Sequence, residues 1–157
     1  MRNLTAAVCL TVALLMGGTA ISWGADFQGG WEAYRSGDYA TALREWTPLA
    51  EQGDANAQNN LGVMYERGRG IAQDYKAAAR WYRLAAKQAY VGAQYNLGGL
   101  YARGQGVAQD YKAAARWYRL AAKQGYAAAQ YSLGIMYDTG QGAPQDYKAA
   151  VKWYRLS

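Results

Sequence analysis

Few side chains of this sequence are suited to acid–base, nucleophilic or metal chemistry. The 157 residues include no histidine and a single cysteine, Cys9. Imidazole and thiol groups are the usual zinc ligands and common catalytic bases and nucleophiles. Without histidine, neither a serine–histidine–aspartate nor a cysteine–histidine set can be assembled. We therefore expect no catalytic residue, no metal site and no cofactor.

The most regular acidic residues are Asp74, Asp110 and Asp146, which stand at equal spacing, each ahead of a helix-forming run. An aspartate at the start of a helix accepts the unpaired N–H groups of the first turn. This role explains the three residues more simply than a catalytic array does. A carboxylate pair is conceivable from Glu66 and Asp138, but solvated surface charge is the default interpretation.

Glycine pairs with one residue between them follow the first helix of each unit, at 68/70, 104/106 and 140/142. Phosphate-binding loops also contain such glycines, but those loops follow a strand and end in Gly-Lys-Ser/Thr or carry a third glycine. Neither condition is met. A glycine just beyond the last residue of a periodic pattern is instead typical of a helix C-cap.

These residues are positioned by an internal repeat. The stretch 72–88 recurs without change at 108–124, and a third copy begins at Gln145 and changes only at Val151 and Lys152 before the sequence stops. The offset is 36 residues (108 − 72). A fixed period of this size is typical of stacked repeat architectures.

Each regular unit predicts a pair of helices. In the first helix, Ala57, Leu61, Met64 and Tyr65 form one apolar stripe at helical spacing. Gly62 interrupts that helix at a cost of about 1 kcal/mol, and its recurrence predicts the close approach of a neighbouring helix. The second helix presents an inward stripe, with the adjacent Trp81 expected to pack between repeats. That stripe consists of Tyr75, Ala78, Ala79, Tyr82 and Ala86.

The start of the chain has the pattern of a secretory signal peptide. Met1-Arg2-Asn3 is positively charged, residues 4–16 are apolar, and small residues follow. We expect cleavage between Ala20 and Ala25 and a periplasmic or secreted protein without a transmembrane segment. An uncleaved anchor helix is the alternative. Cys9 would be removed, so the mature chain could form no disulfide.

We divide the chain into five parts. Residues 1–25 are the signal peptide, 26–53 form a degenerate first unit like a tetratricopeptide repeat, and 57–92, 93–128 and 129–157 are repeats, the last truncated. The formal net charge is +6. Its basic residues mostly recur at matching repeat positions, as a solvated outer helix face requires, so we expect no nucleic-acid partner.

The recurring pattern Ala-x-x-x-Leu-Gly-x-x-Tyr-x-x-Gly-x-Gly, followed by Asp-Tyr-x-x-Ala-x-x-Trp-Tyr, resembles that of the Sel-one-like repeat (SLR) family. The resemblance covers 57–157 closely and 26–53 more loosely. It implies an all-α fold, a right-handed α-solenoid of about four antiparallel helix pairs, which binds other proteins on its concave side. Some secreted, cysteine-rich members are linked to β-lactam binding or hydrolysis. They carry a cysteine pair in each repeat, so we do not transfer that activity to this chain.

The same resemblance places the groove on the first helices. The residues at these groove positions differ between repeats, whereas the residues at the core positions barely change. These positions either read a ligand or have drifted as relaxed surface, and the sequence leaves both open. The candidate partner-binding residues are Asn59, Asn60, Val63, Arg67, Tyr95, Asn96, Arg103, Tyr131, Ser132 and Asp138.

We therefore predict an exported, non-catalytic scaffold that binds a protein or peptide in its concave groove. The alternative is a cell-envelope enzyme, or enzyme modulator, acting on peptidoglycan or β-lactams. A third hypothesis is self-association through the C-terminal end, where Trp153 and Tyr154 are expected to lie on the outer face of the last helix. The sequence does not identify the partner.

Overall fold

The structure is a computed structural model and describes residues 25–157. The predicted signal peptide, with Cys9 and nearly all of the expected cleavage region, lies outside the described residues. Within 25–157 every regular element is an α-helix. None of these helices has both the length and the apolar character needed to cross a membrane.

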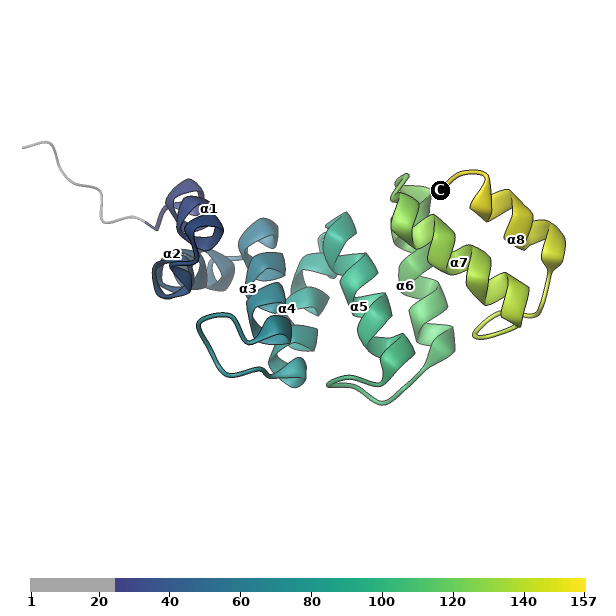
Figure 1. Cartoon of the computed structure of the whole chain (residues 1–157), viewed down its shortest axis with the longest axis horizontal. Coiled ribbons are helices and arrows are strands. Elements are labelled where there is room, and N and C mark those ends of the chain that lie inside the picture. Colours follow the sequence, from purple (N-terminus) through teal and green to yellow (C-terminus); the bar gives the residue numbers. More distant parts are fainter. Residues whose placement is uncertain (1–24) are drawn as a thin grey trace, which may run out of the picture.

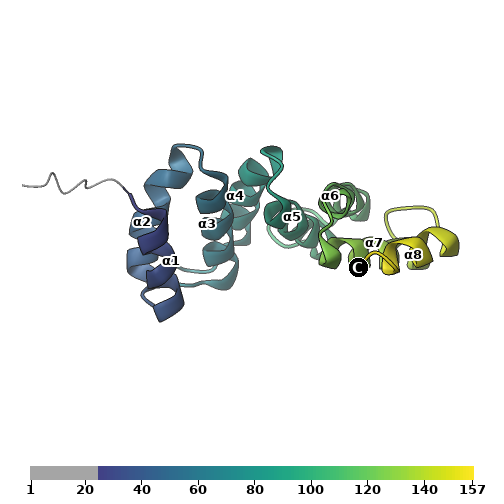
Figure 2. The same ribbon diagram turned by 90° about the horizontal axis from the view of Figure 1, so that it is seen from above.

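The described part contains eight helices, which pack as four consecutive antiparallel pairs along one row (Figure 1). Each helix packs against its neighbours in the sequence, as expected for a solenoid. Turning the molecule shows that successive pairs also rotate relative to one another (Figure 2). The predicted all-α solenoid is confirmed. The helices are α1 (Phe27–Ser36), α2 (Tyr39–Glu51), α3 (Ala55–Arg67), α4 (Tyr75–Lys87), α5 (Val91–Arg103), α6 (Tyr111–Lys123), α7 (Ala127–Thr139) and α8 (Tyr147–Tyr154).

Aspartates cap the second helices, as predicted. The carboxylates of Asp74 and Asp110 accept the backbone N–H groups three residues ahead at 3.0 and 2.9 Å, and Asp146 does the same at 3.0 Å. Each aspartate thus satisfies a donor that has no partner inside the helix. This bonding explains the regular spacing of the aspartates without any catalytic role.

The two glycines of each pair have different roles. Gly104 caps α5 in the left-handed conformation at φ 66°, which a residue without Cβ adopts readily. Gly106 lies against the preceding unit, because a Cβ there would be 2.1 Å from the carbonyl oxygen of Tyr75. Gly142 meets Tyr111 at the same distance. The second glycine therefore lets each loop lie against the first turn of the preceding unit's second helix.

The glycine inside each first helix allows the two helices of a pair to touch. A Cβ on Gly62 would lie 2.5 Å from the ring of Tyr82, far inside van der Waals contact. This confirms the close approach that the sequence predicted. The equivalent distances are 2.7 Å between Gly98 and Tyr118 and 2.6 Å between Gly134 and Tyr154.

The core is built from small side chains and a few rings, with Trp46 and Tyr82 fully buried. A second tryptophan position joins neighbouring units. Trp81 packs on the core formed by α2 and α3, and Trp117 packs on the core formed by α4 and α5. The expectation that this position lies between repeats is confirmed.

Buried glutamines add polar bonds between units. Gln58 donates to the carbonyl of Ala50 at 3.0 Å and accepts from Gln88 at 2.9 Å. Gln94 accepts from Gln124 in the same way at 2.8 Å. The oxygen Oε1 of Gln130 is buried with no hydrogen-bond partner within 25–157. The bond of Gln58 to Ala50, and the matching bond of Gln94 to the carbonyl of Ala86, join each unit to the one before it.

The last helix differs from the expectation in its rotation. Trp153 and Tyr154 are half-buried; Trp153 packs on the core of α6 and α7, and Tyr154 lies over Gly134. The reason is the close approach described above, which turns this face of α8 toward α7. The apolar side chains that α8 leaves exposed are Tyr147 and Val151, with Leu156 just beyond the helix.

The packing predicts opposite effects for two adjacent glycines. Overpacking costs ~1–3 kcal/mol, so Gly98→Ala, which places a Cβ 2.7 Å from the Tyr118 ring, should lower the melting temperature. Gly99→Ala meets only the end of the flexible Arg103 side chain, at 2.9 Å, and gains up to about 1 kcal/mol of helix propensity. Thermal unfolding followed by circular dichroism should rank the proteins Gly99→Ala, wild type, Gly98→Ala. Equal melting temperatures for the two variants would contradict the close approach.

The caps also predict an acid dependence. The N–H of Ala77 holds the pKa of the Asp74 carboxyl below its ordinary value of 3.8. The stabilisation is complete above the unfolded pKa and is lost as pH falls through the lower folded one. Asp74→Asn keeps an acceptor oxygen but does not titrate. Thermal melts between about pH 7 and pH 2 should show wild type losing its advantage over this variant below about pH 4. A difference that stays constant with pH would exclude a titrating cap.

Candidate partner-binding site

The structure brings some of the predicted site residues together and leaves others apart. The ten candidates lie on α3, α5 and α7, the first helices of their pairs. Five of them, together with four other residues, line one cavity of about 180 Å³. The candidates of α7 (Tyr131, Ser132 and Asp138) do not line it. The cavity is formed by Val63, Glu66, Arg67, Tyr82, Tyr95, Asn96, Gly99, Arg103 and Tyr118.

A second cavity, of about 260 Å³, adjoins the first toward the N-terminal pair. We call it the aromatic pocket, and the first cavity the polar pocket. The two share Val63 and Arg67, so they form one continuous surface along the first helices. The sequence missed this part of the site, because the degenerate unit 26–53 was considered only as a divergent repeat. The aromatic pocket is lined by Trp31, Tyr34, Trp46, Asn60, Val63 and Arg67.

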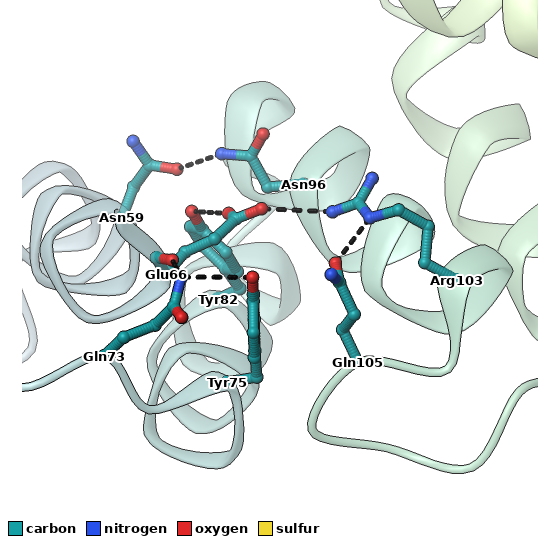
Figure 3. Close-up of polar contacts among 8 residues, drawn as sticks. All are labelled: Asn59, Glu66, Gln73, Tyr75, Tyr82, Asn96, Arg103 and Gln105. Carbon is teal, nitrogen blue, oxygen red and sulfur yellow. Dashed lines mark hydrogen bonds and ion pairs between the residues drawn. The ribbon is translucent and has the colours of Figure 1, made fainter. Parts of the chain in front are cut away.

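Glu66 is the central charged group of the polar pocket. Its carboxylate accepts the hydroxyl of Tyr82 at 2.6 Å and pairs with Nη2 of Arg103 at 3.0 Å (Figure 3). Burial raises the pKa of the Tyr82 hydroxyl, and the charge of Glu66 adds to the shift. Glu66 thus connects α3, α4 and α5. Glu66 belongs to the variable groove positions but not to the ten candidates. The change to Ala102 and Asp138 at the equivalent positions of the next units is the sequence signal that could have identified it as a site residue.

Two of the candidates pack against, or bond to, other side chains of the repeats. Asn59 is only 9% exposed, and its Oδ1 accepts from Nδ2 of Asn96 at 3.2 Å. The ring of Tyr95 packs 5.6 Å from that of Tyr118 and 5.2 Å from that of Tyr126. The expectation that these two positions face away from the core is wrong. Because Gly98 draws α6 close to α5, a ring on the flank of α5 reaches the tyrosines beside it.

Other candidates do face solvent. Tyr131 is 55% exposed although its ring lies 5.6 Å from that of Tyr154. Arg67 and Asp138 are exposed, and Asn60, Val63 and Ser132 are half-exposed. Arg67 makes no hydrogen bond or ion pair with any residue of 25–157, whereas Arg103 is engaged with Glu66 and Gln105. The shared wall of the two pockets therefore carries an unpaired positive charge.

The chemistry available here is that of binding. Glu66 is the only carboxylate lining the two pockets and is already hydrogen-bonded, while Asp138 lies on α7 outside both. No group of three or more acidic or sulfur side chains that could hold a metal ion is found within 25–157. What the surface offers is aromatic area, hydrogen-bond donors and guanidinium groups.

The comparisons agree with this fold. The Sel1 repeat family model matches residues 55–90, 91–126 and 127–157. Among solved structures, a Sel1 repeat protein from Oxalobacter formigenes is 34% identical, with a TM-score of 0.80 over 83% of this chain and 54% of that one. The protein c5321, a protective antigen of uropathogenic Escherichia coli with an SLR fold, is 38% identical, with a TM-score of 0.78.

The second similarity covers 82% of this chain and 28% of c5321. This chain thus spans about half, or less, of these two relatives. No curated protein matches it. Its matched units begin two residues before the boundaries that we placed at Ala57, Ala93 and Ala129. With three matched units and helices of the same arrangement, the chain belongs to the Sel1 repeat family, whose helical scaffolds generally mediate interactions between proteins.

Proposed function

We propose that this protein is an exported, non-catalytic scaffold that binds a protein or peptide segment along its first helices. The observation that carries the proposal is the continuous surface made by the aromatic and polar pockets. Tryptophan, tyrosine and arginine are the residue types that dominate binding energy at protein interfaces. All three types line this surface.

The geometry of the surface suits an extended segment better than a small molecule. Taken singly, the pockets of about 260 and 180 Å³ are each smaller than the roughly 300–1,000 Å³ of typical small-molecule sites, and they follow one another along the surface. Both open along one row of helices, where one side chain could enter each. Export rests on the sequence pattern of residues 1–25, which supports a periplasmic or secreted location.

The alternative, an enzyme or enzyme modulator acting on peptidoglycan or β-lactams, gains no support from the pockets. General acid–base catalysis needs a titratable group free to exchange a proton with the substrate. The carboxylate of Glu66, the only one that lines the aromatic and polar pockets, is held by Tyr82 and Arg103. Asp110, which lines a separate pocket of the described part, is engaged in capping α6. We therefore retain the scaffold as the proposed function.

The test is capture of a partner by matched variants. Arg67→Glu reverses the unpaired charge shared by both pockets, and Arg116→Glu makes the same change on the exposed side of α6. Mature wild type and both variants should be chemically cross-linked in a cell-envelope fraction, purified, and their partners identified by mass spectrometry. We expect Arg67→Glu to lose a partner that wild type and Arg116→Glu both capture. Identical capture by all three would place binding elsewhere on the molecule.

Self-association through the C-terminal end stays a proposal, now with a different surface. The exposed apolar side chains are Tyr147, Val151 and Leu156, at 63%, 47% and 54% exposure. If copies meet there, sedimentation should show concentration-dependent dimers for wild type and a monomer for Val151→Glu/Leu156→Glu. Lys152→Glu is the control for charge on the same helix. A wild-type protein that is monomeric at every concentration would remove the proposal.

A further inference from the structure

Three tyrosines occupy the same repeat position but have different surroundings. Tyr82 donates its hydroxyl to Glu66. Tyr118 stands 36 residues later, where the counterpart of Glu66 is Ala102, which has no acceptor. Its hydroxyl makes no hydrogen bond within residues 25–157, although the residue is only 8% exposed and lines the polar pocket. Because the hydroxyl oxygen is not fully enclosed, it is open to a group that enters the pocket.

A second donor lines the same pocket. Arg103 uses Nη2 for Glu66 and Nε for Gln105, which leaves Nη1 without a partner among the described residues (Figure 3). Nη1 lies over Gly99, because a Cβ added there would be 2.9 Å from it. The counterparts of Gly99 in the other repeats are Val63 and Ile135, so the guanidinium can lie against the helix at this point only in the middle repeat.

Both groups are donors at neutral pH. Burial raises the pKa of the Tyr118 hydroxyl to about 12, and a guanidinium is always charged in proteins. Asn96 adds an amide on the same wall. Tyr118 and Arg103 therefore offer, in one pocket, the same two types of donor that Tyr82 and Arg103 offer to Glu66. A group that fits the pocket must accept hydrogen bonds and carry negative charge.

We propose that the polar pocket receives the carboxylate of an aspartate or glutamate side chain of the bound partner, held by Tyr118 and Arg103. The volume of about 180 Å³ suits one side chain. The chain's own Glu66 shows that a side-chain carboxylate is accepted by this combination of donors. The inference rests on the proposed function, since it names the chemistry of the segment that the same surface would bind.

The test uses N-acetyl-glutamate-N-methylamide as the probe, titrated into ¹⁵N-labelled mature protein. N-acetyl-glutamine-N-methylamide is the matched neutral probe, and N-acetyl-alanine supplies a main-chain carboxylate. We expect the glutamate probe to shift the signals of Gly99, the Asn96 side chain and Nε of Arg103, and the glutamine probe to leave them unchanged. A response to N-acetyl-alanine alone would overturn the assignment to an acidic side chain.

Two variants test the donors. Tyr118→Phe keeps the ring and removes the hydroxyl. It should weaken the binding of the glutamate probe about tenfold or more, as expected for loss of a hydrogen bond to a charged group. Tyr111→Phe is the control, because the hydroxyl of Tyr111 lies outside the polar pocket and accepts a hydrogen bond from Gln109. This variant should bind the glutamate probe as wild type does. Ala102→Glu supplies the missing carboxylate from the chain itself and should abolish the response, whereas Ala102→Gln should not.

The results separate this inference from the proposed function. If wild type does not bind the glutamate probe but Arg67→Glu still loses its cross-linked partner, the carboxylate assignment is wrong and the proposed scaffold function is retained. Equal affinity of wild type and Tyr118→Phe for the probe also overturns the assignment. If the probe binds as described and no variant affects partner capture, the pocket is a carboxylate site but the proposed function fails.

Discussion

The structure depends on the contact, in each of the three regular repeats, between a glycine in the first helix and a tyrosine ring in the second helix. Any Cβ at Gly62, Gly98 or Gly134 would lie within 2.7 Å of that ring, so no other residue allows the helices of a pair to approach this closely. The approach sets the rotation of the second helix. It thereby buries Trp117 against the neighbouring unit and places the tyrosine hydroxyl at the edge of the first-helix surface.

The candidate site arises where the repeats stop being identical. The core residues recur from unit to unit, but Glu66 and Gly99 have no identical counterpart in the other repeats. Arg103 shares its residue type with Arg67 (103 − 36), and of the two only Arg103 forms an ion pair within 25–157. Together, Glu66, Gly99 and Arg103 turn one of three similar positions into a pocket with a satisfied carboxylate on one side and unpaired donors on the other. A repeat protein can acquire specificity in this way at no cost to packing, because the variable offsets lie outside the glycine–tyrosine contacts.

The sequence was sufficient for the fold because its signals are local and repeated: aspartate caps, glycine C-caps, and one apolar stripe per helix. It was less informative about the site. Helical phase placed Tyr95 and Asn59 on the groove face, but phase does not reveal that a long ring or amide there reaches a neighbouring helix. The aromatic pocket depends on Trp31 and Tyr34 of the degenerate unit, whose contact with α3 is a tertiary feature that no spacing encodes.

The bonds from Arg103 to Glu66 and from Asn96 to Asn59 both cross from α5 to α3 on the pocketed face. They join successive units on that face, while the buried glutamines Gln58 and Gln94 join them elsewhere by donating to the carbonyls of Ala50 and Ala86 in the preceding unit. An occupant that draws the guanidinium of Arg103 away from Glu66 would lengthen one of these two contacts and leave the glutamine hydrogen bonds intact. If the pocket is occupied in this way, the separation of α3 and α5 on this face would depend on the occupant.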